Sequence, residues 1–102
     1  MSRSRVDFQY LLEKILGSRN VYFQPPATIQ MKYPAIVYSL NDINSIHANN
    51  DMYLQKNSYE VILIDKNPDS KTPSELLKVP YSRFDRSYTS DNLNHFVFTI
   101  NY

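Results

Sequence analysis

The sequence predicts an α+β fold: a mostly antiparallel sheet of four to five strands, with an N-terminal helix and a second short helix packed on one face. Two observations support this prediction. Apolar residues recur at helical spacing near the N-terminus, and β-prone runs separated by turn residues follow, with one short helical segment among them. A length of 102 residues is near the commonest domain size, so we expect residues 1–102 to form a single domain.

The N-terminal helix is predicted from an apolar stripe over residues 5–16. Its members are Phe8, Leu11, Leu12, Ile15 and Leu16. They fall on one face of an α-helix. Ser4 suits the N-cap of this helix. Gly17 is the only glycine of the chain and suits the position after the last turn, where a left-handed conformation ends many helices. No glycine then remains for a phosphate-binding loop.

Five segments have the composition and boundaries of strands. They span residues 21–24, 33–39, 58–65, 84–89 and 95–102. Segment 58–65 carries apolar residues on both faces, so we expect it to lie centrally in the sheet. In the last segment, alternation places Phe96, Phe98, Ile100 and Tyr102 on one face. The order of the strands in the sheet stays open.

Residues 41–57 are predicted to form a long loop, because they are rich in Asn and Asp and their apolar residues show no clear period. Loops longer than about 12–15 residues are uncommon in compact domains and tend to be functional. The apolar residues of this loop need cover, which a neighbouring subunit would supply. Tyr53 is therefore a candidate contact residue, and the alternative is that Tyr53 anchors the loop to its own domain.

The second helix is predicted to begin with a capping box. Thr72 is expected as the N-cap, with Pro73 at the first helical position and Glu75 at the third. Pro80 ends the helix, because proline lacks the amide hydrogen that a further turn requires.

No group of residues has the spacing of a catalytic or metal site. His47 and His95 have no second ligand at a suitable spacing. Asp65, Asn67 and Asp69 have the spacing that opens a calcium-binding loop, but the later glycine and glutamate of such a loop are absent. The chain has no cysteine, which excludes disulfides and thiolate catalysis. We therefore expect no enzymatic activity and no cofactor.

Nine tyrosines make the chain rich in a residue type that is enriched at protein–protein interfaces. Four of them lie on or beside predicted strands and are expected to contribute to packing: Tyr22, Tyr33, Tyr38 and Tyr59. Tyr10 lies on the first helix but off its apolar stripe, and it has no assigned role. The predicted contact residues lie in the loop and near the terminal strands. They are Tyr53, Tyr81, Arg83, Arg86, Tyr88 and Tyr102.

Basic and aromatic residues interleave over residues 81–88, which is a weak feature of nucleic-acid binding. Strict alternation along a strand would place Arg83 and Arg86 on opposite faces, with Asp85 between them. A solvated or interfacial strand with a local Asp–Arg pair is the favoured interpretation. The net charge of +1 predicts no strong attraction to nucleic acid or to an acidic membrane. No apolar run approaches the ~20 residues of a membrane span.

Four segments form a pattern along the chain. They are 20–26 (NVYFQPP), 31–38 (MKYPAIVY), 64–70 (IDKNPDS) and 91–95 (DNLNH). In this order and spacing, the chain resembles the tail terminator (tail completion, head–tail joining) proteins of tailed bacteriophages that infect Gram-positive bacteria. The resemblance extends from the first helix to the last strand, and none of its segments is a catalytic signature.

The resemblance implies a structural virion protein of the phage neck, assembled in the host cytoplasm. Its partners would be further copies of itself in a homohexameric ring, the tail tube protein, and the head-completion or connector protein. Genome DNA would pass through the ring without specific binding, and no membrane would be involved. Identical subunits of a ring meet through heterologous interfaces, so each copy must present two different contact surfaces to its neighbours.

Two other functions stay open. The first keeps the virion but changes the position: a head-completion or connector stopper protein of the neck. The second belongs to a different class, a small nucleic-acid-binding accessory protein that uses Arg83, Arg86 and nearby tyrosines. Binding that weakens steeply with salt would be typical of the second.

Overall fold

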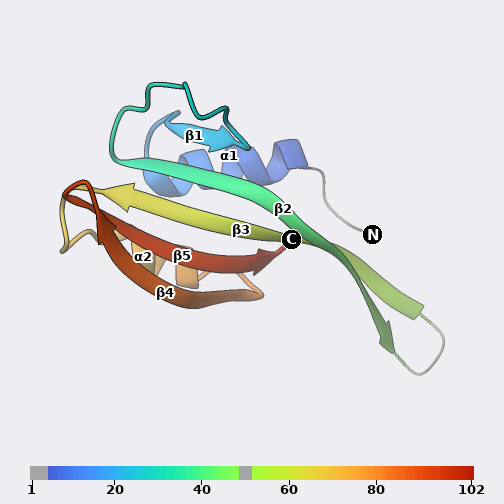
Figure 1. Cartoon of the computed structure of the whole chain (residues 1–102). Coiled ribbons are helices and arrows are strands. Elements are labelled where there is room, and N and C mark those ends of the chain that lie inside the picture. Colours follow the sequence, from blue (N-terminus) through green and yellow to red (C-terminus); the bar gives the residue numbers. More distant parts are fainter. Residues whose placement is uncertain (1–4, 49–51) are drawn as a thin grey trace.

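The computed structural model describes the backbone of residues 5–48 and 52–102 and the side chains of residues 5–41 and 57–102. The elements in chain order are α1 (Arg5–Leu16), β1 (Val21–Phe23), β2 (Ala35–Ala48), β3 (Met52–Asp65), α2 (Thr72–Leu77), β4 (Ser82–Ser90) and β5 (Leu93–Asn101). The strands form one sheet in the order β1-β2-β3-β5-β4 (Figure 1). β1 and β2 are parallel, and the other neighbouring pairs are antiparallel. The predicted α+β fold is confirmed.

Both helices pack on the same face of the sheet and lie behind it in Figure 1. Phe8 and Leu12 of α1 and Leu76 of α2 are fully buried in one apolar cluster with Tyr38 and Phe98 of the sheet. Burial of each large apolar side chain contributes about 1.5–3 kcal/mol to stability. The predicted apolar stripe of α1 therefore forms one half of the core.

Phe8 is the centre of an aromatic group on this helix-covered face. Its ring centroid lies 4.7 Å from that of Tyr59, 4.8 Å from that of Tyr102 and 5.5 Å from that of Tyr38. Such separations are those of favourable stacked and edge-to-face ring pairs. Tyr38 and Tyr59 are buried and Tyr22 is half-buried, which confirms the prediction that part of the tyrosine content fills the core. The packing role predicted for Tyr33 is wrong, because this residue precedes β2 and is 39 % exposed.

The end of α1 is as predicted. Gly17 adopts a φ of 82°, and its amide donates to the carbonyl oxygen of Glu13 at 2.9 Å. A left-handed residue at this position is the usual way to end a helix. Ser4, the expected N-cap, lies outside the described residues.

Neither helix in the described part of the chain is long and apolar enough to cross a membrane.

The core strands also follow the prediction. Segment 58–65 belongs to β3, which lies in the middle of the sheet between β2 and β5. β4 and β5 form a hairpin whose turn residues, Asp91 and Asn92, have φ values of 53° and 63°. Two consecutive left-handed residues match the twist of a two-residue hairpin turn, and Asp and Asn tolerate this conformation well.

The predicted long loop over residues 41–57 is wrong. The described parts of this segment continue β2 and β3, which stay paired from Asp42 with Ser58 to Ala48 with Met52. A register shift between Leu40 and Asp42 precedes this extension. The segment is rich in Asn and its apolar residues show no clear period, so the sequence did not indicate strands. The strands form because the two halves of the segment pair with each other. We call the outermost two-stranded part, residues 44–48 and 52–56, the arm.

The predicted capping box at α2 is also wrong. The N-cap is Lys71, which has a helical φ of −86° and makes no side-chain cap hydrogen bond. The helix therefore starts one residue early, and Thr72 lies inside it. The Thr72 amide donates instead to Ser70 Oγ at 3.2 Å, and Glu75 pairs with Lys78 at 3.1 Å.

Candidate functional site

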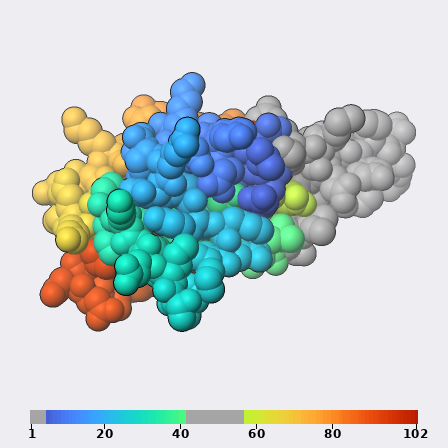
Figure 2. All heavy atoms as spheres, turned by 90° about the horizontal axis from the view of Figure 1, so that it is seen from above, coloured from blue at the N-terminus to red at the C-terminus, as the bar shows by residue number. Residues whose placement is uncertain are grey.

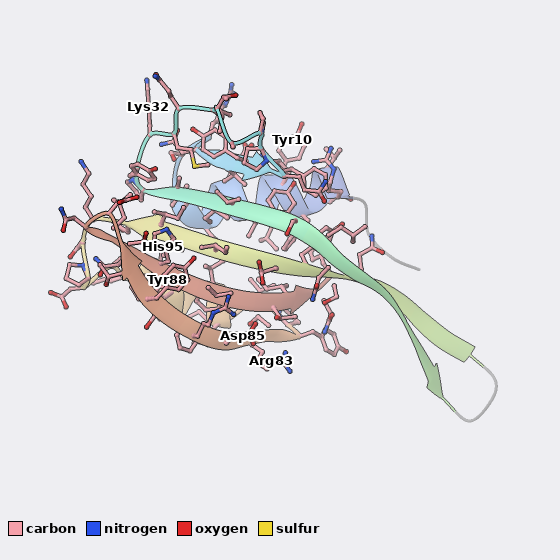
Figure 3. The ribbon with its side chains drawn as sticks, viewed as in Figure 1. Tyr10, Lys32, Arg83, Asp85, Tyr88 and His95 are labelled. Carbon is pink, nitrogen blue, oxygen red and sulfur yellow. The ribbon has the colours of Figure 1, made fainter. Side chains whose placement is uncertain are left out.

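The sheet face opposite the helices, which we call the open face, is the candidate site. Cross-strand pairing builds three rows of residues across β2, β3, β5 and β4. The rows are Ala35, Ile64, His95 and Tyr88; Val37, Ile62, Val97 and Arg86; and Ser39, Glu60, Thr99 and Arg83. This face is turned toward the viewer in Figures 1 and 3, and no helix lies over it. Each row runs from β2 to a larger polar or aromatic side chain on β4.

A groove of about 590 Å³ lies on the open face. Its floor includes Val37, Glu60 and Ile62, and one of its walls is formed by Tyr88 and His95. The other wall is the loop of residues 24–34, which joins β1 to β2. Viewed from above, this loop (teal) and the β4–β5 turn (red) both extend on the side away from α1 (Figure 2). The groove is therefore bounded by two segments that are distant in sequence.

The loop wall of the groove is fixed at its start by Gln24. This residue has a φ of 45°, its amide donates to Tyr38 O at 2.9 Å, and its side-chain Oε1 accepts from the Leu40 amide at 3.1 Å. Pro25 and Pro26 follow, and proline has a fixed φ. The chain therefore leaves the edge of the sheet in a defined direction, and it borders the first residues of β2, Val37 and Ser39, before it enters that strand at Ala35.

The opposite wall is a stacked pair of rings. Tyr88 and His95 face each other across β4 and β5 with centroids 4.6 Å apart and an interplanar angle of 9° (Figure 3). Nδ1 of His95 lies 3.1 Å from the carbonyl oxygen of Leu93, within hydrogen-bond distance of this acceptor. Cross-strand aromatic pairs contribute about 0.2–1 kcal/mol to a sheet, and this pair presents its remaining ring surface to the groove.

The prediction that Arg83 and Arg86 lie on opposite faces of their strand is wrong. β4 shifts register between Phe84 and Arg86, so Arg83 pairs with Thr99 and Arg86 with Val97. Thr99 and Val97 are two residues apart on β5 and share a face. The extra residue of a β-bulge moves each later side chain of the strand to the face opposite to the one that strict alternation predicts. Both arginines consequently lie on the open face, with Tyr88.

Asp85, the extra residue of the bulge, is held by two neighbours. Arg83 Nε donates to Asp85 Oδ1 at 3.1 Å, and Thr99 Oγ1 donates to Asp85 Oδ2 at 2.6 Å (Figure 3). The predicted local Asp–Arg pair is therefore present. The Arg83 side chain is largely exposed, and an exposed pair of this kind contributes only about 0–1 kcal/mol. Its main effect is to orient the bulge.

Glu60 is the acidic residue on the floor of the groove. It is half-buried between Ser39 and Thr99, its neighbours in the same row. Among the side chains that the structure describes, none forms an ion pair or a hydrogen bond with its carboxylate. A half-buried carboxylate without a partner favours binding of a positively charged group.

The other predicted contact residues are not gathered at this site. Tyr81 precedes β4, is 59 % exposed and has a φ of 63°. Tyr102 is half-buried and its ring packs at a tilt against Phe8 on the helix-covered face, which gives it a packing role in its own domain. The side chain of Tyr53 lies outside the described residues. Of the predicted set, the structure brings together Arg83, Arg86 and Tyr88.

Sequence reasoning missed Glu60, Ile62 and the 24–34 loop as parts of one site. Glu60 interrupts an otherwise apolar segment, and this interruption is the signal that it faces a different environment from its neighbours. The contribution of the loop had no comparable signal, because its position depends on the parallel pairing of β1 with β2.

A separate polar network lies under α1. The hydroxyl of Tyr38 accepts a hydrogen bond from Arg5 Nη1 at 3.1 Å and donates to Gln9 Oε1. Gln9 Nε2 in turn donates to the carbonyl oxygen of Val21 at 3.0 Å. Burial raises the pKa of Tyr38 above its ordinary value of 10.0, against the lowering effect of Arg5. This network joins α1 to β1 and β2, and it faces away from the groove.

The described residues contain no cluster of three or more side chains suited to holding a metal ion. A smaller hollow of about 340 Å³ lies between the helices, where Leu11 and Ile15 face Val79 and Pro80. The open face therefore combines the larger of these two hollows with two arginines, a stacked aromatic pair and Glu60, whose carboxylate has no partner among the described side chains. No protein-family model and no curated protein matches this chain significantly.

Proposed function

We propose that this chain is a structural subunit of a bacteriophage neck: a tail terminator whose copies form a ring that caps the tail tube and joins it to the head connector. The four-segment resemblance in the sequence indicates this family. The arm is the structural observation that favours a subunit of an assembly. We accordingly place the protein in the virion, with the tail tube protein and the connector protein as its partners.

The arm extends the molecule beyond the five-stranded part of the sheet (Figure 1). Five paired rows, from Asn44 with Lys56 to Ala48 with Met52, lie beyond the point where Tyr102 pairs with Asn57. At about 3.3 Å per residue these rows span roughly 17 Å. An isolated two-stranded ribbon is marginally stable in water, and this one contains Ile46, Met52 and Leu54 in its sequence. Cover by a second chain would stabilise it.

An arm at one end of a subunit suits a ring. Identical subunits in a ring contact each other through two different surfaces, one on each side. A projecting ribbon supplies the first surface, and the body of the neighbouring copy supplies the second. The maximal extent of 48 Å against 25 and 21 Å in the other directions gives each copy the reach for such a contact.

The test is deletion of the gene in the phage. We expect unjoined heads and abnormally long tails, because nothing would stop growth of the tail tube, and we expect complementation by the wild-type chain to restore both. Tails of normal length would refute the terminator assignment. If the tails are normal and DNA leaks from the heads, the protein would instead be the connector stopper.

Nucleic-acid binding is a second candidate, favoured by the bulge that brings Arg83 and Arg86 to the same face as Tyr88. Arginines beside an aromatic ring are typical of surfaces that bind single strands. Asp85 and Glu60 on the same face oppose this. Retention of the wild-type protein on single-stranded DNA at low salt, and its loss in an Arg83→Ala/Arg86→Ala variant, would support this candidate. Absence of retention at low salt would remove it.

A further inference from the structure

The groove follows the direction of β3. Glu60, Ile62 and Ile64 of this strand line it, and they are two positions apart, so their side chains point to the same face. At about 3.3 Å per residue, the line of side chains from Glu60 to Ile64 spans roughly 13 Å. An extended segment of about five residues has the same two-residue repeat, so its alternate side chains can meet these residues one after another.

The two ends of the groove differ in chemistry. Glu60 and Ser39, which are paired across β3 and β2, form a polar end. The stacked rings of Tyr88 and His95 form the other end, and Ile62 lies between the two ends. A segment that fits this arrangement therefore carries a polar group at one end, followed by apolar side chains.

The formal charge of the groove is negative. Among the described residues that line it, Glu60 is the charged one. Its half-buried carboxylate has no partner among the described side chains, and a partly desolvated charge favours a countercharge. Arg83, the cation in the same row, is paired with Asp85 at 3.1 Å. Arg86 lies in the next row and does not line the groove. A lysine or arginine of a partner would supply the missing countercharge.

We propose that the groove binds an extended segment of a partner protein in which a lysine or arginine is followed, two and four positions later, by apolar residues. The cation lies at Glu60, the first apolar side chain over Ile62, and the second beside Ile64 and Tyr88. This inference goes beyond the proposed function, because it names the chemistry of the ligand that the groove takes. It does not depend on the neck assignment.

Titration with a model peptide tests the recognition. The probe is the acetylated and amidated peptide Lys-Ser-Val-Ser-Leu, added to isotope-labelled protein and followed by NMR. We expect saturable shifts of the backbone amides of Glu60, Ile62 and His95, with the amides of α1 unchanged. Absence of these shifts up to about 5 mM peptide, where a complex with a Kd of about 1 mM is mostly formed, would overturn the proposal.

A second peptide and one variant test the role of the carboxylate. Gln-Ser-Val-Ser-Leu lacks the cation and should bind the wild type about fivefold more weakly. Glu60→Gln keeps the shape of the side chain but not its charge, so it should bind both peptides equally. Asp69→Asn is the matched control, because it removes an exposed carboxylate outside the groove, and it should keep the wild-type preference. A preference that persists in Glu60→Gln would overturn the proposal.

The two-residue repeat has its own test. Lys-Val-Ser-Leu-Ser has the composition of the first peptide, but its apolar residues stand one position nearer to the lysine. In an extended segment they then point to the side opposite to the one that meets Ile62, so weaker binding is expected. Equal affinity of the two peptides would contradict the extended register. Both peptide comparisons on the wild type need no variant, so they decide the matter even if Glu60→Gln fails to fold.

Dilution of the protein without peptide tests a rival occupant. We expect spectra that do not change with protein concentration. Shifts of the groove amides with concentration would show that a second copy fills the groove, and the proposed ligand would then be wrong. The deletion phage gives a separate answer: long tails without peptide binding would leave the neck function intact, and peptide binding with normal tails would leave the ligand of the groove intact.

Discussion

The two faces of the sheet differ in what covers them. The helix-covered face is closed by Phe8, Leu12 and Leu76, and its residues in the middle of the sheet, such as Tyr38, Leu63 and Phe98, are fully buried. The open face carries Glu60, Tyr88 and the groove, and the loop of residues 24–34 covers only part of this face. The same strands supply both faces, since successive residues point to opposite sides. The difference indicates that one face holds the domain together and the other is available for contact.

The largest expected effect comes from breaking the helix-covered face. Phe8→Ala removes a fully buried ring that contacts three tyrosine rings. Truncation of a buried phenylalanine costs about 3–5 kcal/mol, because it loses apolar burial and leaves a cavity. Urea unfolding measures this loss, and Phe8→Leu is the control that retains most of the volume. A loss below 1 kcal/mol for Phe8→Ala, on the scale of roughly 0.5 kcal/mol usual for surface positions, would contradict the role of Phe8 as the centre of the core.

Gly17→Ala is expected to have the next largest effect. The φ of 82° disfavours any side chain, although a Cβ at this position would meet no atom within 4 Å. The cost is therefore a backbone cost of about 1–2 kcal/mol, which would appear as a lower midpoint in urea unfolding. Gly17→Asn is the control, because asparagine tolerates the left-handed region better. Equal stability of the alanine and wild-type chains would show that α1 does not need this ending.

Tyr38→Phe removes the hydroxyl that Arg5 and Gln9 share and should cost about 1 kcal/mol at neutral pH. The pKa of Tyr38 is raised by burial above its ordinary value of 10.0. The folded state thus keeps the proton while the unfolded state loses it. Stability should fall as the pH rises above 10.0 and toward the folded pKa.

The measurement is the unfolding free energy as a function of alkaline pH. The wild type should lose stability more steeply than Tyr38→Phe in this range, and the two curves should converge. Tyr10→Phe, at a position that is 63 % exposed, is the control for loss of a tyrosine hydroxyl. Parallel curves for the wild type and Tyr38→Phe would show that the buried hydroxyl is not responsible for the alkaline loss.

The smallest effect on stability is expected at the open face. Tyr88 is 43 % exposed and stacks on His95, so Tyr88→Ala should cost less than about 1 kcal/mol. Thermal unfolding measures this loss. A loss of stability as large as that of Phe8→Ala would remove the contrast between the two faces.

The fold follows largely from patterns that are local in the sequence. The apolar stripe of α1, Gly17 at its end, the apolar segment 58–65 and the Asp91-Asn92 turn each express a preference of neighbouring residues. Helical periodicity and turn chemistry depend on residues within a few positions of each other. These features were therefore predicted, and the structure confirms them.

The candidate site depends on contacts that no local pattern contains. The arm exists because residues 44–48 pair with residues 52–56, although their composition is that of a loop. A single extra residue, Asp85, decides that Arg83 and Arg86 share a face. The groove requires the 24–34 loop to pass over the open face. Of the predicted contact residues whose side chains the structure describes, Arg83, Arg86 and Tyr88 lie together on the open face.

The sequence by itself therefore determined the helices, the central strand and the hairpin turn. It also indicated that aliphatic and aromatic side chains, tyrosines among them, fill the core. Tertiary structure decided the register of the strands, the bulge in β4, the extent of the β2–β3 ribbon and hence the open face. The physical reason is that periodicity and turn preference act between neighbours along the chain. Register and bulges are instead selected by which cross-strand pairing leaves the fewest unpaired groups and buries the most apolar surface.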